Sequence, residues 1–329
     1  MTFYSKKEAT ALINELGAQD APFLFVIDYE QTNCYVSLLS EIDAAEVKYS
    51  FPSCTNDPSE HHALEKIDIQ WDTFPEPSGV YRRKFDIVQH HLHAGNSFLT
   101  NLTCRIPVRT SLSLLDIYRH SIAMYKLWFN AQFVCFSPEI FIRIEDGCIY
   151  GHPMKGTISA SEPDAQAILM ADAKEAAEHA TIVDLIRNDL SIVASKVRVP
   201  RYRYVDRLHT NKGDILQTSS EVSGVLHPDY RSHMGDILFS QLPAGSITGA
   251  PKQKTVEIIS QAEDYSRGFY TGVMGICEGG RMESAVMIRF VEAAEDGRMY
   301  FKSGGGITAR SEWESEYNEV IQKAYVPIY

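Results

Sequence analysis

Lys155 stands in the stretch HPMKGTIS (residues 152–159), between the pairs Pro-Met and Gly-Thr. A lysine is most often a solvated surface residue without a special role. Turn-forming neighbours could instead hold its amine toward a bound molecule. A lysine amine becomes a nucleophile once part of it is neutral, which desolvation or a nearby cation can bring about. Lys155 is therefore a candidate nucleophile.

Two pairs of glutamates have helical spacing. Glu175 and Glu178 are three residues apart in a predicted helix, and Glu316 and Glu319 repeat this spacing near the C-terminus. Each pair shares one face of its helix. A single pair of this kind usually lies on a solvated face and has no function. Two pairs that face each other would form a cage of carboxylate oxygens, which suits Mg²⁺.

Two glycine-rich stretches and one arginine could bind a carboxylate. The stretches are PAGSITGAPK (243–252) and SGGGIT (303–308), and the second is predicted to be a loop that runs into the last helix. Backbone N–H groups at such a helix start bind anions, although glycines can also serve only to form a turn. Neither stretch has the spacing of a Walker loop or supports a dinucleotide site. Arg289, in the apolar strand AVMIRF, could grip a carboxylate in a bidentate manner.

Together these residues suggest a substrate with at least one carboxylate, bound with Mg²⁺ and close to a lysine. The net charge of −12 argues against broad binding of nucleic acid or an anionic membrane, since either would need a basic face. The six cysteines show no CxxC spacing, which fits a reducing compartment. No apolar run approaches ~18 residues, and the N-terminus resembles an amphipathic helix more than a signal peptide, so we expect a cytoplasmic protein.

Both helices and strands are expected to position these side chains. Periodicity and end signals predict helices over 1–20, 81–95, 113–125, 164–194 and 252–264, and at the end of 303–325. Strands are predicted within 21–39, 97–108, 133–156, 222–226, 269–290 and 299–304, with a surface excursion over 50–80.

The dipeptide Asp146-Gly147 predicts a hairpin that would bring Lys155 close to a carboxylate. A two-residue loop would pair Pro138 with Lys155. One bulged residue more would set Glu139 opposite Lys155, on the same face of the sheet. In either register the Glu139 carboxylate and the lysine amine would lie close together on neighbouring strands.

Several stretches, in this order along the chain, resemble the chorismate-utilising enzymes. They are SPE, PMKGT, IVDLIRNDLS, PAGSITGAPK, SGGGIT and the terminal ExxE, and the resemblance runs from about residue 81 to the end. It implies an α+β fold with two antiparallel sheets packed face to face and helices on the outside. It also implies a single domain over 1–329, with a shortened N-terminal portion (about 1–80) and a catalytic core (about 81–329).

The lysine distinguishes between branches of that family. The anthranilate branch typically has alanine at this position, whereas the aminodeoxychorismate synthase component I branch has the P-x-K-G-T pattern seen at Lys155. The isochorismate and salicylate branches place a lysine on an earlier strand, where FLTNLTC offers Thr100. The resemblance therefore implies amination of chorismate at C4 to 4-amino-4-deoxychorismate, for 4-aminobenzoate and folate biosynthesis.

The resemblance also implies roles for individual residues. Lys155 would add at C2 of chorismate, with Glu139 as general acid or base beside it. The residues implied in substrate binding are Arg289, Tyr270, Gly305 and Gly306 around the enolpyruvyl carboxylate, and Gly275, Thr157, Thr248 and Lys252 elsewhere at the pocket. Mg²⁺ would be held by Glu178 and Glu319, with Glu175 and Glu316 nearby, and would bind the ring carboxylate.

Three departures from the family pattern affect the expected activity. Gln217 stands where many members have histidine, which argues against pyruvate elimination of the anthranilate type. The shortened N-terminal portion leads us to expect no regulation by tryptophan. We expect no GxCxG-like nucleophile loop of the amidotransferase type, so ammonia is expected from solution or from a separate glutamine amidotransferase subunit. Anthranilate synthase, isochorismate synthase and a non-catalytic chorismate-binding subunit are the alternatives.

Overall fold

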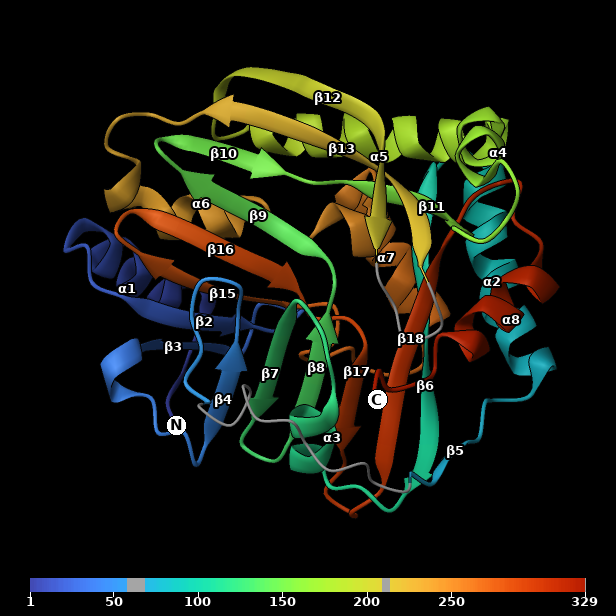
Figure 1. The fold of residues 1–329 in the computed structure, drawn as a ribbon, viewed down its shortest axis with the longest axis horizontal. Coiled ribbons are helices and arrows are strands. Elements are labelled where there is room, and N and C mark those ends of the chain that lie inside the picture. The colour runs from blue at the N-terminus through green and yellow to red at the C-terminus, as the bar shows by residue number, and fades with distance from the viewer. Residues whose placement is uncertain (58–68, 209–213, 329) are drawn as a thin grey trace.

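The chain folds into two antiparallel β-sheets that pack against each other (Figure 1). The computed structural model describes residues 1–57, 69–208 and 214–328. Within this part, the first sheet has the order β1-β3-β2-β15-β16-β9-β10-β13-β11, and β12 pairs with β13. Its strands are β1 (Phe3–Tyr4), β2 (Phe23–Ile27), β3 (Cys34–Leu38), β9 (Ile140–Glu145), β10 (Cys148–Gly151), β11 (Met154–Ser159), β12 (Ser195–Leu208), β13 (Ile215–Val225), β15 (Val273–Glu278) and β16 (Arg281–Val286).

The second sheet has the order β14-β6-β18-β17-β8-β7-β4, and β5 pairs with β6. Its strands are β4 (Val47–Ser50), β5 (Trp71–Thr73), β6 (Leu99–Thr110), β7 (Tyr125–Phe129), β8 (Phe133–Ser137), β14 (Gly249–Ala250), β17 (Phe290–Ala293) and β18 (Met299–Ile307). Strand pairs between β2 and β15 and between β4 and β7 join residues before 80 to both sheets.

Strand β2 shows why the first sheet is apolar on both faces. All five residues of its sequence FLFVI are buried. Leu24 and Val26 pack against the second sheet, whereas Phe23, Phe25 and Ile27 pack against the outer helices. A strand covered on both faces has no place for the usual alternation of polar and apolar residues.

Helices cover the outer faces of both sheets, which confirms the predicted α+β fold. On the first sheet lie α1 (Lys6–Ala18), α5 (Ala173–Ser191) and α6 (Met234–Ser240). On the second lie α2 (Ser78–His93), α3 (Leu114–His120), α7 (Lys252–Ala262) and α8 (Trp313–Gln322), and α4 (Ala165–Ala171) precedes α5. Figure 1 shows α5 along β13 and α8 beside β18. In the described ranges, no helix is long and apolar enough to cross a membrane.

Two predicted helices differ from the observed elements, and one observed strand was not predicted. The helix over 113–125 ends at His120, because residues 125–129 form β7 and are buried at every position. The single helix over 164–194 is divided at Asp172, whose side chain accepts from Glu175 N at 3.0 Å and caps α5. Strand β12 was not predicted, and part of the surface excursion over 50–80 lies outside the described residues.

The glycine run and Arg289 also differ from expectation. Gly304, Gly305 and Gly306 lie in strand β18, paired with β6, and not in a loop at a helix start. Arg289 lies between β16 and β17 with φ of +53°, outside the strand in which it was predicted. The strand that pairs with the glycine run, β6, is far away in the sequence, so the local pattern did not reveal this pairing.

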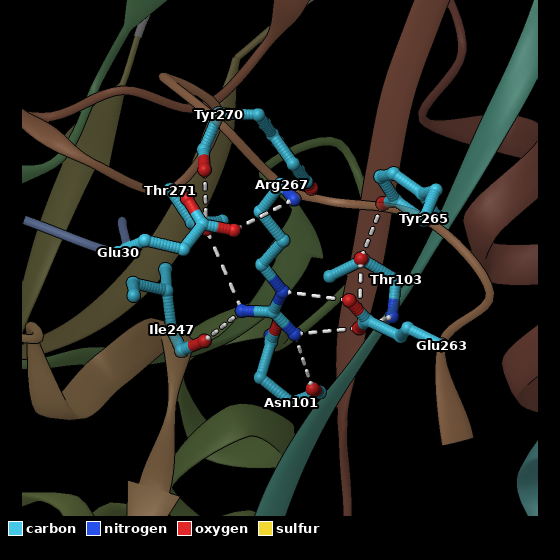
Figure 2. Close-up of polar contacts among 9 residues, drawn as sticks. All are labelled: Glu30, Asn101, Thr103, Ile247, Glu263, Tyr265, Arg267, Tyr270 and Thr271. Atoms are coloured by element: carbon cyan, nitrogen blue, oxygen red, sulfur yellow. Dashed lines mark hydrogen bonds and ion pairs between the residues drawn. The ribbon is translucent and has the colours of Figure 1, made fainter. Parts of the chain in front are cut away.

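A buried ion pair fastens the second sheet to the segments around it (Figure 2). Arg267 is 1% exposed, and its Nη2 lies 2.6 Å from Glu263 Oε1. The same guanidinium donates to Ile247 O at 2.9 Å and to Asn101 O at 2.8 Å. Thr103 Oγ1 donates to Glu263 Oε1 at 2.8 Å. Strand β6, the end of α7 and the loop before β14 are thereby held together.

The substitution Arg267→Met should destabilise the protein strongly, because it leaves the Glu263 carboxylate buried without its cation. We expect a loss of about 3–5 kcal/mol in the free energy of unfolding, measured by chemical denaturation. Arg298→Met is the matched control, because Arg298 pairs with Asp296 at 2.7 Å on the surface. The control should show no measurable loss. Equal stability of the two variants would contradict this role for Arg267.

Candidate active site

Lys155 is placed by a long strand pairing with β13. The predicted two-residue turn is present, with φ of +49° at Asp146 and +73° at Gly147. The β9–β10 ladder ends at Arg143↔Tyr150, however, and β11 pairs with β13, where Lys155 lies opposite Thr218. The predicted pairing of Lys155 with residue 138 or 139 is therefore wrong.

A bulge at Gly156 directs the lysine toward α5. The register shifts between Lys155 and Thr157, and Gly156 has φ of +73°. A Cβ atom at Gly156 would lie 3.0 Å from Glu175 Oε2, so the strand and the helix approach closely here. Lys155 Nζ lies 3.5 Å from Glu178 Oε2, and the Lys155 side chain is 27% exposed. A Cβ at Gly306 would lie 3.5 Å from the same Nζ.

Lys155 lines a cavity of about 680 Å³, which lies between α5, α8 and strands of both sheets. This volume is within the range of small-molecule sites. Most of the predicted site residues line it. They are Lys155, Glu139, Thr157, Glu175, Glu178, Tyr270, Arg289, Gly305, Gly306, Glu316 and Glu319.

The glutamate pairs on α5 and α8 face the same cavity. Burial raises the pKa of Glu175, and the charge of Glu178 raises it further. Burial also raises the pKa of Glu316, with repulsion from Glu319 as a further cause. Burial has the same tendency at Glu319, but Lys323 Nζ, 2.5 Å from its Oε1, outweighs it and lowers the pKa of Glu319. Glu175 and Glu316 therefore lose their protons less readily than ordinary carboxyl groups.

Glu139 lines the same cavity and is partly buried. Burial raises the pKa of its carboxyl group. A hydrogen bond donated by Ser246 Oγ to Oε1 and the positive charges of Lys155 and Lys323 act in the other direction. A carboxyl group with a raised pKa that lines the same cavity as a lysine suits proton transfer.

Only some of the hydrogen-bond donors of the Arg289 guanidinium have acceptors within the described part of the protein. Its Nη1 donates to Lys323 O at 3.1 Å, and its charge lies 5.3 Å from the centre of the Tyr325 ring. Among the described residues, no carboxylate lies within ion-pair distance of Arg289. The free donors are therefore available to a carboxylate in the cavity.

The glycines of β18 form an open strand edge along the cavity. Strand β17 pairs with β18 only as far as Lys302. The partners of Gly304 and Gly306 on β6 donate elsewhere, since Thr103 N donates to Glu263 at 2.9 Å and Asn101 N to Thr248 O at 2.8 Å. By the alternation of an antiparallel ladder, the peptide groups of Gly304 and Gly306 point away from β6.

Three predicted site residues do not line the cavity. Gly275 lies in β15, where a Cβ would be 2.3 Å from the Phe25 ring, so close packing inside the sheet accounts for the glycine. Thr248 is fully buried in the loop before β14. Lys252 Nζ lies 2.8 Å from Asp189 Oδ2 and donates to Gln241 O at 2.7 Å, so its charge is already paired.

Residues 9–328 match the chorismate binding enzyme family. The chain belongs to this family. It is 45% identical over 318 residues to an uncharacterized PabA-like protein of Haemophilus influenzae, and the match covers 96% of this chain and 95% of the relative. It is 31% identical over 313 residues to aminodeoxychorismate synthase component 1 of Escherichia coli, covering 91% of this chain and 66% of the relative.

Solved structures of other family members share the fold. The menaquinone-specific isochorismate synthase of Escherichia coli has a TM-score of 0.74 at 16% identity, over 98% of this chain and 82% of that one. Anthranilate synthase component I of Streptococcus pneumoniae has a TM-score of 0.71 at 22% identity, over 92% of this chain and 79% of that one. These similarities support the predicted α+β architecture.

The family's motifs did not indicate every residue that lines the cavity. Lys323, Lys302, Lys174, Asn101 and Ser246 line it without having been singled out. Lys323 could have been noticed, because it follows Glu319 by four residues and thus shares its helix face. Ser246 lies within the quoted PAGSITGAPK stretch, but only the fold brings it to Glu139. Gln217, noted as a departure from the family pattern, also lines the cavity.

The four glutamates fit a Mg²⁺ ion in their donor chemistry. All offer carboxylate oxygens, which Mg²⁺ prefers, and all line the same cavity. In the part of the chain that the structure describes, however, no three potential metal ligands converge closely enough to hold an ion as they stand. The positive charges beside two of these carboxylates are lysine ammonium groups: Lys155 lies 3.5 Å from Glu178, and Lys323 lies 2.5 Å from Glu319.

The substitution Gly156→Ala should destabilise the protein and disturb the lysine strand. An alanine there would have an unfavourable positive φ and would press on the Glu175 carboxylate. Gly95→Ala is the matched control, since Gly95 has φ of +74° and no atom within 4 Å of the added methyl. We expect a loss of about 1 kcal/mol for the control and more for Gly156→Ala in chemical denaturation. Equal losses would show that contact with Glu175 does not matter.

Proposed function

We propose that this protein aminates chorismate at C4 to give 4-amino-4-deoxychorismate, for 4-aminobenzoate and folate biosynthesis. The observation that carries this proposal is the position of Lys155, whose ammonium faces a cavity lined by Glu139, Arg289 and carboxylates of α5 and α8. Aminodeoxychorismate synthase component 1 of Escherichia coli, 31% identical to the chain, supports the same branch of the family.

Substrate binding would use the two carboxylates of chorismate. Arg289 has free donors for the enolpyruvyl carboxylate, and the open edge of β18 offers the Gly306 N–H beside it. Tyr270 lines the same cavity. Mg²⁺ would be held by Glu178 and Glu319, with Glu175 and Glu316 nearby, and would supply positive charge for the ring carboxylate. Lys155 and Lys323 would then have to move away from the two binding glutamates.

The reaction would proceed through a lysine adduct. The neutral amine of Lys155 adds at C2, the two ring double bonds shift, and the C4–O bond breaks. Glu139 gives its proton to the departing hydroxyl group, which leaves as water. Ammonia then adds at C4, the double bonds shift back, and the bond from C2 to Lys155 breaks. The ammonia gives up a proton to Glu139, so that the acid is restored and one water is formed for each amine incorporated.

The ammonia would come from solution or from a separate glutamine amidotransferase subunit. The GxCxG match at Gly275–Gly279 does not form a loop that could release ammonia from glutamine, because Cys277 lies in strand β15 and is buried. We expect the reaction to take place in the cytoplasm, where chorismate and such a subunit would be available.

Chromatography with mass detection tests the proposal directly. Purified protein is mixed with chorismate, Mg²⁺ and ammonium, and the product is identified. We expect a Mg²⁺-dependent product in which an amine replaces the C4 hydroxyl and the pyruvyl group is retained. Anthranilate or isochorismate would assign the chain to another branch. Absence of turnover with ammonium and with an added amidotransferase would favour a binding subunit.

The Lys155→Ala variant tests the covalent route on the same assay. It should retain Mg²⁺-dependent binding of chorismate, because the carboxylate-binding groups remain, and should lose at least about 100-fold in amination rate. Binding is measured by calorimetry without ammonium. Full amination by the variant would rule out the lysine adduct and leave the family membership unaffected.

The affinity for Mg²⁺ should rise with pH. The pKa values of Glu175 and Glu316 are raised, chiefly by burial, so more of each group is protonated at a given acidic pH than in an ordinary carboxyl. Mg²⁺ binding requires the ionised forms, and its affinity should therefore fall as the pH drops through these raised values. Calorimetric titration with chorismate present and ammonium absent measures this. Glu316→Gln should flatten the dependence, and an affinity independent of pH would exclude these carboxylates as the binding group.

A further inference from the structure

Ser246 lies at the wall of the cavity and contacts the carboxylate of Glu139. It belongs to the short 3-10 helix η4 (Gly245–Ile247) between α6 and α7. Its hydroxyl donates a short hydrogen bond to Glu139 Oε1. Among the described residues, no lysine or arginine lies within ion-pair distance of Glu139, although Lys155 and Lys323 line the same cavity. The serine hydroxyl is thus the one protein donor in contact with this carboxylate in the described chain.

The segment that carries Ser246 is held on both sides. Arg267 Nη1 donates to Ile247 O at 2.9 Å, and Asn101 N donates to Thr248 O at 2.8 Å. Beyond the segment, Lys252 Nζ is bound to Gln241 O at 2.7 Å and lies 2.8 Å from Asp189 Oδ2. These contacts are largely buried and carry charge, so they restrict the movement of the serine backbone.

Glu139 is fixed at its backbone as well. Its N–H donates to Ser137 Oγ at 3.0 Å, and its carbonyl accepts from Val286 N at 3.1 Å. With Oε1 held by Ser246, the side chain cannot rotate freely. The other oxygen, Oε2, has no hydrogen-bond partner in the described part of the chain, and Glu139 lines the cavity.

We propose that Ser246 is a positioning residue for proton transfer by Glu139. Its hydroxyl holds one carboxylate oxygen so that the other faces the substrate. This inference rests on the proposed function, in which Glu139 protonates the departing C4 hydroxyl. It also gives Lys252 a role that differs from the predicted substrate contact: Lys252 fastens the segment that carries Ser246.

A positioning role predicts a specific kinetic pattern for Ser246→Ala. The rate constant kcat should fall about 10- to 100-fold, since a hydrogen bond to a charged group is lost, while KM for chorismate should stay within about twofold. The pH profile of kcat/KM should change too. Without the hydroxyl, the ionised form of Glu139 is less stabilised, so the limb that Glu139 contributes should move to higher pH. Glu139→Gln identifies that limb, because it should abolish it.

Three further variants complete the experiment. Ser246→Thr keeps the hydroxyl and should recover most of the activity and the original pH profile. Ser246→Ala in the Glu139→Gln background should add little, because the serine then has no carboxylate to position. Ser260→Ala on α7 is the matched control, since the Ser260 hydroxyl bonds only to Glu257 O at 2.8 Å, away from the cavity, and this variant should behave as the wild type.

The outcomes separate the inference from the proposed function. An unshifted pH profile in Ser246→Ala, additive losses with Glu139→Gln, or a loss seen mainly in KM would overturn the positioning role. The wild-type product decides the proposed function. If that product is anthranilate or isochorismate, the variants are compared in that reaction, because the C4 hydroxyl must depart there as well, and the Ser246 result still supports or overturns the inference.

Discussion

The buried ion pair between Arg267 and Glu263 is the interaction on which the candidate site depends most. One guanidinium binds the carboxylate at the end of α7, the carbonyl of Ile247 and the carbonyl of Asn101 (Figure 2). The first carbonyl follows Ser246, and the second lies on the strand opposite Gly306. Because an unpaired charge at this depth would cost several kcal/mol, the three segments cannot separate without large loss of stability. Arg267 thus binds two segments that line the cavity, one at Ile247 and one at Asn101.

The site also depends on a balance of charge that neither sheet provides alone. Lys155 comes from the first sheet, Gly306 from the second, and the glutamates from α5 and α8, which cover different sheets. Lysines lie against Glu178 and Glu319, which lowers the repulsion among the carboxylates. Such a site exists only when both sheets and both helices are in place, so binding of a ligand there should be tightly linked to the folded state.

Much of the site could be predicted from the sequence because its motifs are local. The glutamate pairs needed only the helical repeat, and Lys155 needed only its short turn-like context. The predictions failed where distant pairing decides the structure. Three successive glycines disfavour a strand, yet β6 holds them in one through a regular ladder. Arg289 adopts a positive φ between two strands, which an apolar run cannot reveal.

Lys252 and Glu139 show the same limit at the level of side chains. Lys252 has the type expected of an anion-binding group, but Asp189 and the Gln241 carbonyl lie within reach only in the folded chain. Glu139 lies near Lys155 through the shape of the cavity, and not through the hairpin register that the sequence favoured. The sequence showed that these positions hold a lysine and a glutamate. It did not show which residues would contact them in the folded chain, and these contacts determine the role of each side chain.

The early end of β17 gives the second sheet an incomplete row of hydrogen bonds beside Gly304 and Gly306. A bound carboxylate that accepts hydrogen bonds from this edge would occupy the position that the next residue of β17 would take if that strand continued. The ligand would then act as a part of the sheet, and its departure would return the N–H groups of this edge to water, whereas Gly304 O accepts from Lys323 Nζ at 3.2 Å. Recognition at this wall would therefore follow the rules of strand pairing, in which the backbone provides the contact and the absence of a side chain provides the room.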